Sequence, residues 1–128
     1  MADRFNMSGD FRGAIVNIKS TLTNVQQSVG EIPTEDEAAR KQLEDLIGQL
    51  SEALQKVPAE HQEQAQAVAE TAKVLVESAK AEKPNKTMLQ ISGEGLKQAA
   101  QNLAGVMPTV VTIAGQIVVT IAKLTGAM

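Results

Sequence analysis

The stretch that decides the fold runs from Gln98 to Ala122 and reads QAAQNLAGVMPTVVTIAGQIVVTIA. It holds no charged residue, in a chain of 128 residues of which 21% are charged. Eleven of the 17 residues from Val106 to Ala122 are Val, Ile or Thr, so a buried strand is one interpretation. The polar residues recur every three or four positions, however, and this spacing favours a helix. A helix that is apolar nearly all round is buried in protein or in lipid.

On such a helix the polar residues and Gly105 share one narrow arc. They form a narrow seam whose members are candidates for an interaction surface or for the lining of a pore: Gly105, Thr109, Thr112, Gln116 and Thr120. A seam of this kind can face solvent or a second subunit in a soluble bundle. Alternatively, it can line an aqueous pore if several copies assemble in a membrane. Threonine is inexpensive to bury, because its hydroxyl can bond a carbonyl one turn back, and this favours the soluble bundle.

Composition excludes several classes of function. The 12 Lys and Arg residues are dispersed and the net charge is −3, which argues against a nucleic-acid partner. Phe5 and Phe11 are the only aromatic residues, so the chain lacks the Trp and Tyr that usually flank membrane-spanning helices. There is no Cys, and the polar N-terminus MADRFNMSGDF does not resemble a signal peptide. Cytoplasmic residence is therefore expected, with membrane association as the alternative.

Outward from the apolar stretch, the patterns predict one domain, mainly α, folded as an antiparallel three- to four-helix bundle with a short N-terminal β hairpin or extended arm. The arm is expected because Ala14-Ile15-Val16-Asn17-Ile18 is rich in strand formers and follows the turn residues Gly9 and Asp10. The predicted domain covers residues 1–128 and contains, in order, the arm (1–19), a short helix (20–32), a helical hairpin (34–57 and 59–82) and a long apolar C-terminal helix (86–124) kinked near Pro108.

The helix over 34–57 has the strongest signals. Thr34 and Glu37 have the spacing of a capping box, and Pro58 ends the helix and starts the next. The helix over 59–82 presents a face built largely of alanine, so its partner must pack close to it. The apolar face of the first helix of the hairpin comprises Leu43, Leu46, Ile47, Leu50, Ala53, Leu54 and Val57.

No pattern predicts catalytic, cofactor-binding or metal-binding residues. His61 is the only His, and with Glu60 and Glu63 it does not share one helix face, so a metal site is not expected. Ser8, Asp10 and His61 could be combined into a hydrolytic triad, but the nucleophile motif GxSxG is missing. The segment Ser92-Gly93-Glu94-Gly95 lacks the strand and the Lys-Ser/Thr of a phosphate loop and predicts a bend or a close helix contact. The chain is therefore not expected to be an enzyme.

Two blocks, GDFRGAIVNIKSTLTNV and EKPNKTMLQISGEGLKQAAQNLAGVMP, resemble small uncharacterised bacterial modules that occur alone or attached to signalling and conflict-system proteins. The resemblance implies an effector-associated interaction domain and carries no functional residue.

Together these observations predict a non-catalytic, self-associating protein-interaction module in bacterial signalling or defence. Its partners would be a second copy of itself and another protein. The alternative is a membrane-active helical protein whose segment 103–124 inserts into a bilayer or forms a pore.

Overall fold

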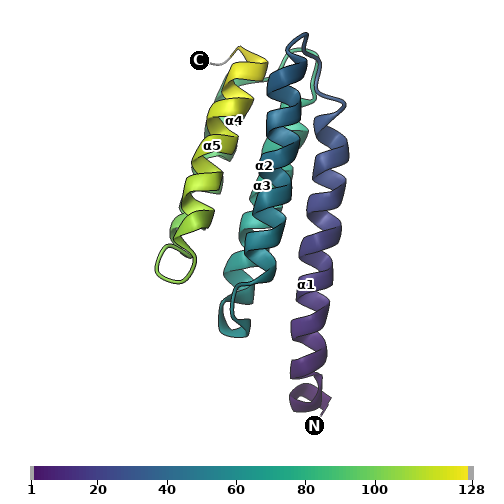
Figure 1. Ribbon diagram of the computed structural model, residues 1–128, viewed down its shortest axis with the longest axis vertical. Coiled ribbons are helices and arrows are strands. Elements are labelled where there is room, and N and C mark those ends of the chain that lie inside the picture. Colours follow the sequence, from purple (N-terminus) through teal and green to yellow (C-terminus); the bar gives the residue numbers. More distant parts are fainter. Residues whose placement is uncertain (1, 127–128) are drawn as a thin grey trace.

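The computed structural model describes residues 2–126, and the side chains of residues 15–126. Over this range the chain forms five α-helices and one short 3₁₀ helix, with no strand (Figure 1). In chain order these are α1 (Ala2–Val29), α2 (Glu37–Gln55), η1 (Ala59–His61), α3 (Gln62–Ala79), α4 (Lys86–Gln101) and α5 (Pro108–Thr125). The expectation of a mainly α bundle is confirmed, but over the described residues the bundle has five α-helices where three or four were predicted.

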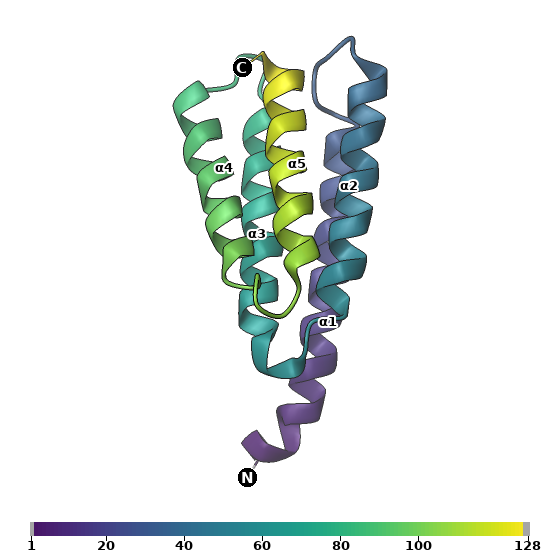
Figure 2. The same ribbon diagram turned by 60° about the vertical axis from the view of Figure 1, so that its left-hand side comes forward.

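Successive helices run in opposite directions (Figures 1 and 2). Around the bundle the packed pairs follow the order α1–α2–α5–α4–α3 and back to α1. Four of these five pairs are antiparallel, and α1 and α3 are parallel. The first turns of α1 extend beyond the ends of the other helices (Figures 1 and 2).

The core is one cluster that takes buried side chains from all five helices. All seven predicted apolar residues of the helix over 34–57 are buried, from Leu43 to Val57. In α3 the buried residues include Ala65, Ala69, Ala72 and Ala79, as the alanine-rich pattern requires of a closely packed helix.

The predicted β hairpin or extended arm over 1–19 is wrong, because α1 is helical from Ala2 onward. Residues Ile18, Leu22, Val25 and Val29 are all buried, and their spacing of 4, 3 and 4 is helical. Half-buried Ile15 extends this stripe by three positions into the strand-like segment. Burial of a helical face thus overrides the strand propensity of Ile and Val. Residue 1 and residues 127–128 of the predicted domain lie outside the described residues.

The predicted single helix over 86–124 is two helices folded back on each other. Pro108 does not kink a helix; it occupies the first turn of α5, where its missing N–H costs nothing. Met107, which precedes it, takes φ −144° and ψ 74°, outside the helical region. Tight bonds close the turn, including Met107 N–H to Leu103 O at 2.7 Å. Reversal of the chain lets α5 bury Ile113, Ile117 and Ile121, which a straight continuation would leave beyond the bundle.

The two helices predicted over 34–57 and 59–82 are found with narrower bounds as α2 and α3, which are antiparallel but do not form a packed hairpin. These two helices are not close neighbours, since α2 packs on α1 and α5, and α3 packs on α1 and α4. The turn at Pro58 therefore joins two helices that both pack on α1 and not on each other.

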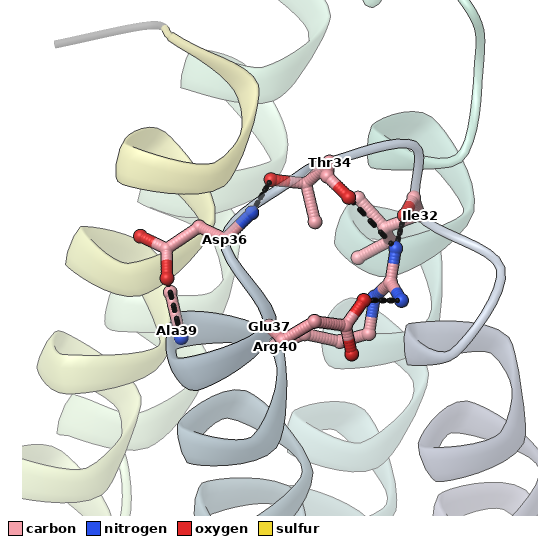
Figure 3. A network of polar contacts seen from close by, with 6 residues as sticks. All are labelled: Ile32, Thr34, Asp36, Glu37, Ala39 and Arg40. Carbon is pink, nitrogen blue, oxygen red and sulfur yellow. Dashed lines mark hydrogen bonds and ion pairs between the residues drawn. The ribbon is translucent and has the colours of Figure 1, made fainter.

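The connection between α1 and α2 corrects the predicted capping box (Figure 3). Asp36, not Thr34, caps the helix: its Oδ1 accepts from Ala39 N–H at 3.0 Å. Thr34 Oγ1 accepts from Asp36 N–H at 3.1 Å and so supports the cap. Glu37 does not reach back to Thr34, because its carboxylate pairs with Arg40 at 2.6 Å.

Arg40 holds the same connection from the other side (Figure 3). Its Nη2 donates to Ile32 O at 2.6 Å and to Thr34 O at 3.2 Å. Its side chain is 18% exposed, so these bonds are shielded from water. The guanidinium thereby satisfies backbone carbonyls that no helix covers.

Candidate interaction surface

The structure separates the predicted seam into three environments. Gly105 lies in the exposed turn between α4 and α5, and a Cβ added there would meet no atom within 4 Å. Thr109, Thr112 and Gln116 lie on α5 and are exposed. Thr120 is only 4% exposed, and its Oγ1 donates to Gln116 O at 2.8 Å. Four of the five predicted residues therefore reach the surface and Thr120 does not.

Val119 occupies the surface position that Thr120 was expected to fill. It is 54% exposed and follows Gln116 by three residues, where Thr120 follows by four. Both spacings are helical, so only polarity favoured Thr120. The outer row of α5 comprises Thr109, Thr112, Gln116, Val119 and Lys123.

A second surface, missed by the sequence patterns, lies along α3 and α4. Val74 on α3 is 48% exposed, and Met88 and Ile91 on α4 are 45% and 59% exposed. Helices α3 and α4 have the most extensive contact in the bundle and are antiparallel (Figure 2). The signal for this surface is weak in sequence, since an isolated Val, Met or Ile on a polar helix face is common.

A cleft of about 340 Å³ opens where α4 and α5 meet over α3. Leu75, Leu89 and Ile121 contribute apolar side chains to its lining, and Lys86 and Gln90 provide its polar groups. A Cβ built on Gly93 would lie 3.2 Å from Val118 Cγ1, so α4 and α5 approach closely at this glycine. The predicted close helix contact at Ser92-Gly93-Glu94-Gly95 is therefore confirmed.

Charge is distributed unevenly along the chain. Residues 31–82, which include α2 and α3, carry twelve Asp and Glu against five Lys and Arg. Residues 83–128, which include α4 and α5, carry four Lys and a single Glu. The surface is thus acidic over the middle helices and weakly basic over the last two.

Polar groups that chemistry would need are dispersed over the described part of the molecule. Residues 15–126 contain no group of three or more His, Asp and Glu placed to hold a metal ion. Their buried polar side chains are the neutral Gln62, Ser92 and Thr120. Gln62 Nε2 donates to Val57 O at 2.8 Å, and Thr120 bonds within its own helix, so both act in holding the fold. His61 lies at the start of α3 and is half-buried.

The described surface therefore combines exposed apolar side chains with regions of opposite charge on neighbouring helices.

Comparison with protein-family models, with curated proteins and with solved structures finds no match to this chain.

Proposed function

We propose that the chain is a non-catalytic interaction module that associates with itself and presents its remaining surface to another protein. The observation that carries the proposal is the exposure of Val74, Met88 and Ile91 on α3 and α4, at 45–59% each. Large aliphatic side chains that cluster on an otherwise polar surface are a feature of interaction sites. The place in bacterial signalling or defence rests on the sequence resemblance alone.

Self-association is tested by analytical ultracentrifugation of the purified chain from about 1 to 500 μM. A rise of the weight-average mass from one copy toward two or more is the expected result. A mass of one copy over the whole range would contradict self-association.

A second candidate function is insertion of α5 into a membrane. The observation that favours it is the composition of Pro108–Thr125, 18 residues with a mean hydropathy of 1.4, long and apolar enough to cross a bilayer. Against it, seven residues of α5 are buried inside the bundle, among them Ile113, Ile117 and Ile121. Withdrawing α5 would uncover the faces of α2 and α4 that it covers, and each large aliphatic side chain so exposed costs about 1.5–3 kcal/mol.

Vesicles separate the two candidates. The wild-type chain should remain in the supernatant when the vesicles are sedimented, and it should release no dye trapped inside them. Robust dye release that changes with substitutions at Thr109, Thr112 or Gln116 would favour the pore-lining seam instead.

A further inference from the structure

The exposed apolar residues of α3 and α4 lie side by side. A Cβ built on Gly95 would be 3.9 Å from Thr71 Cγ2, which places these two residues at the same level of the antiparallel pair. With a rise of 1.5 Å per residue, Val74 lies about 4.5 Å and Ile91 about 6 Å from that level, in the same direction. Met88 follows one helical turn farther. Val74, Ile91 and Met88 therefore form one patch, here called the α3–α4 patch.

Glu70 and Glu77 border this patch on the α1 side, with the exposed Lys73 between them in the sequence. Glu70 lines a shallow cleft together with Asn17 and Thr21 of α1. Glu77 accepts a hydrogen bond from Ser28 Oγ of α1 at 3.3 Å, and it also pairs with Lys80 at 3.4 Å, a surface contact that contributes little. Both glutamates are exposed and lie seven residues apart on one ridge of α3.

Lysines border the patch on the opposite, α5 side. Lys86 lines the cleft between α4 and α5. Lys97 follows Gly93, which touches Val118 of α5, by one helical turn and so points to the same side. Lys97 is 48% exposed, and its pairing with Glu94 at 3.8 Å is a surface contact that contributes little.

From this arrangement we infer that the α3–α4 patch binds the same patch of a second copy, about a two-fold axis parallel to the helices. The inference rests on the proposed self-association and names its surface. Rotation about such an axis lays α4 of one copy over α3 of the other at equal height. Glu70 then faces Lys97 of the second copy within about 1.5 Å of the same level, and Glu77 faces Lys86 within about 4.5 Å. The apolar residues meet at the centre.

The perpendicular two-fold axis in the same plane is disfavoured by charge. It would lay α3 over α3 and bring Glu70 and Glu77 of one copy toward the same residues of the other. Like charges facing each other suppress such a contact, whereas opposite charges fix the register.

The size of the face sets the strength of the contact. Two helices of 16 and 18 residues, about 25 Å long and together about 20 Å wide, offer about 500 Å² per copy. The total of about 1,000 Å² is at the low end for specific interfaces. Contacts of this size are usually weak, so rapid exchange between one and two copies is expected.

Two charge reversals in separate chains test the pairing. In a dimer of E70K, the introduced ammonium group of one copy faces Lys97 of the other. In a dimer of K97E, Glu70 of one copy faces the introduced carboxylate of the other. Each variant should therefore self-associate about tenfold more weakly than the wild-type chain. A mixture of the two chains restores both opposite-charge contacts. The mixed dimer, measured by sedimentation velocity with one chain labelled, should form within about threefold of the wild-type dissociation constant.

The apolar centre is tested with a matched pair. Ile91→Asp should weaken self-association more than tenfold, while Val119→Asp, at a similarly exposed position on α5, should leave it unchanged. Both positions are more than half exposed, so circular dichroism should show the wild-type helical content for each variant.

The outcomes separate this face from self-association itself. A wild-type chain that remains a single copy to about 500 μM overturns both the inference and the proposed self-association. If Ile91→Asp self-associates as strongly as the wild-type chain, and mixing E70K with K97E restores no association, then the inference of the α3–α4 patch is overturned but self-association is not. Weaker self-association of Val119→Asp would show that the contact lies on α5. Stronger self-association of E70K by itself would overturn the inferred direction of the two-fold axis.

Discussion

At the scale of single residues, Arg40 organises the connection between α1 and α2. Its guanidinium joins Ile32 O, Thr34 O and the Glu37 carboxylate. Arg40→Met should lower the free energy of unfolding by about 1–3 kcal/mol, because shielded carbonyls lose their donors. Arg40→Lys should recover little of that loss, since an ammonium cannot reproduce the planar fork. Denaturant titration followed by circular dichroism measures both changes.

Lys41→Met is the control for this prediction, because Lys41 is the next residue and is exposed. The free energy of unfolding of Lys41→Met should stay within about 0.5 kcal/mol of the wild-type value. Equal stability of Arg40→Lys and the wild-type chain would show that charge alone, and not the fork, supports the connection.

Residue-level patterns in the sequence predict the buried positions well and the polar details poorly. The face from Leu43 to Val57 is buried as predicted, because helical periodicity reports burial directly. The cap fell on Asp36 and not on Thr34, since both side chains suit a cap and their distance from the helix start decides between them. The exposed position was assigned to Thr120 and not to Val119 for a similar reason. Val119 and Thr120 follow Gln116 by three and four residues, and both spacings are helical.

At the scale of elements, α5 is the helix on which the two candidate functions differ. Ile117 is fully buried, whereas Thr112 on the same helix is exposed. Ile117→Asp should destabilise the bundle by about 3–5 kcal/mol or prevent folding, because it buries an unpaired carboxylate. Thr112→Asp should change stability by less than about 1 kcal/mol. Thermal unfolding of the two variants provides the comparison.

An equal loss of stability in Ile117→Asp and Thr112→Asp would mean that α5 is surrounded on all sides, as in an oligomer or a membrane. Unchanged melting of Ile117→Asp would mean that α5 does not belong to the core.

Elements were predicted best where apolar spacing and end signals agreed, as in α2. The N-terminal arm was wrong because strand propensity in a short segment yields to tertiary burial, which a local window does not contain. The long C-terminal helix was wrong for a different reason. Pro108 is compatible with a kink or with a helix start, and only the apolar area available on α2 and α4 decides for the start.

At the scale of the whole molecule, all five helices share one core, and this predicts cooperative unfolding. Heat should unfold the bundle in one transition with an enthalpy of roughly 80–90 kcal/mol near 60 °C, from about 0.7 kcal/mol per residue. Calorimetry at a concentration where single copies predominate should yield a van't Hoff enthalpy equal to the calorimetric one.

Two resolved transitions, or a van't Hoff enthalpy well below the calorimetric value, would contradict this prediction. The α4–α5 pair would be the first candidate for a separately melting unit, because it is continuous in sequence and its two helices contact each other.

The order of helices around the bundle was beyond the sequence patterns. Short connections indicate antiparallel neighbours, yet α2 and α3 follow each other across Pro58 without packing closely. The contacts between α2 and α5, and between α1 and α3, join segments far apart in the chain. Complementary side-chain shapes select such pairs, and apolar periodicity does not distinguish one buried face from another.

An odd number of alternating helices carries the chain from one end of the bundle to the other (Figures 1 and 2). The path enters at the free end of α1 and leaves at the opposite end, where Gly126 takes φ 71° after α5. Two domains fused to the two ends would be held apart by roughly the 42 Å length of α1, at 1.5 Å for each of its 28 residues. The bundle is therefore suited to act as a rigid spacer in series and unsuited to insertion into a loop of a host domain, which requires adjacent termini.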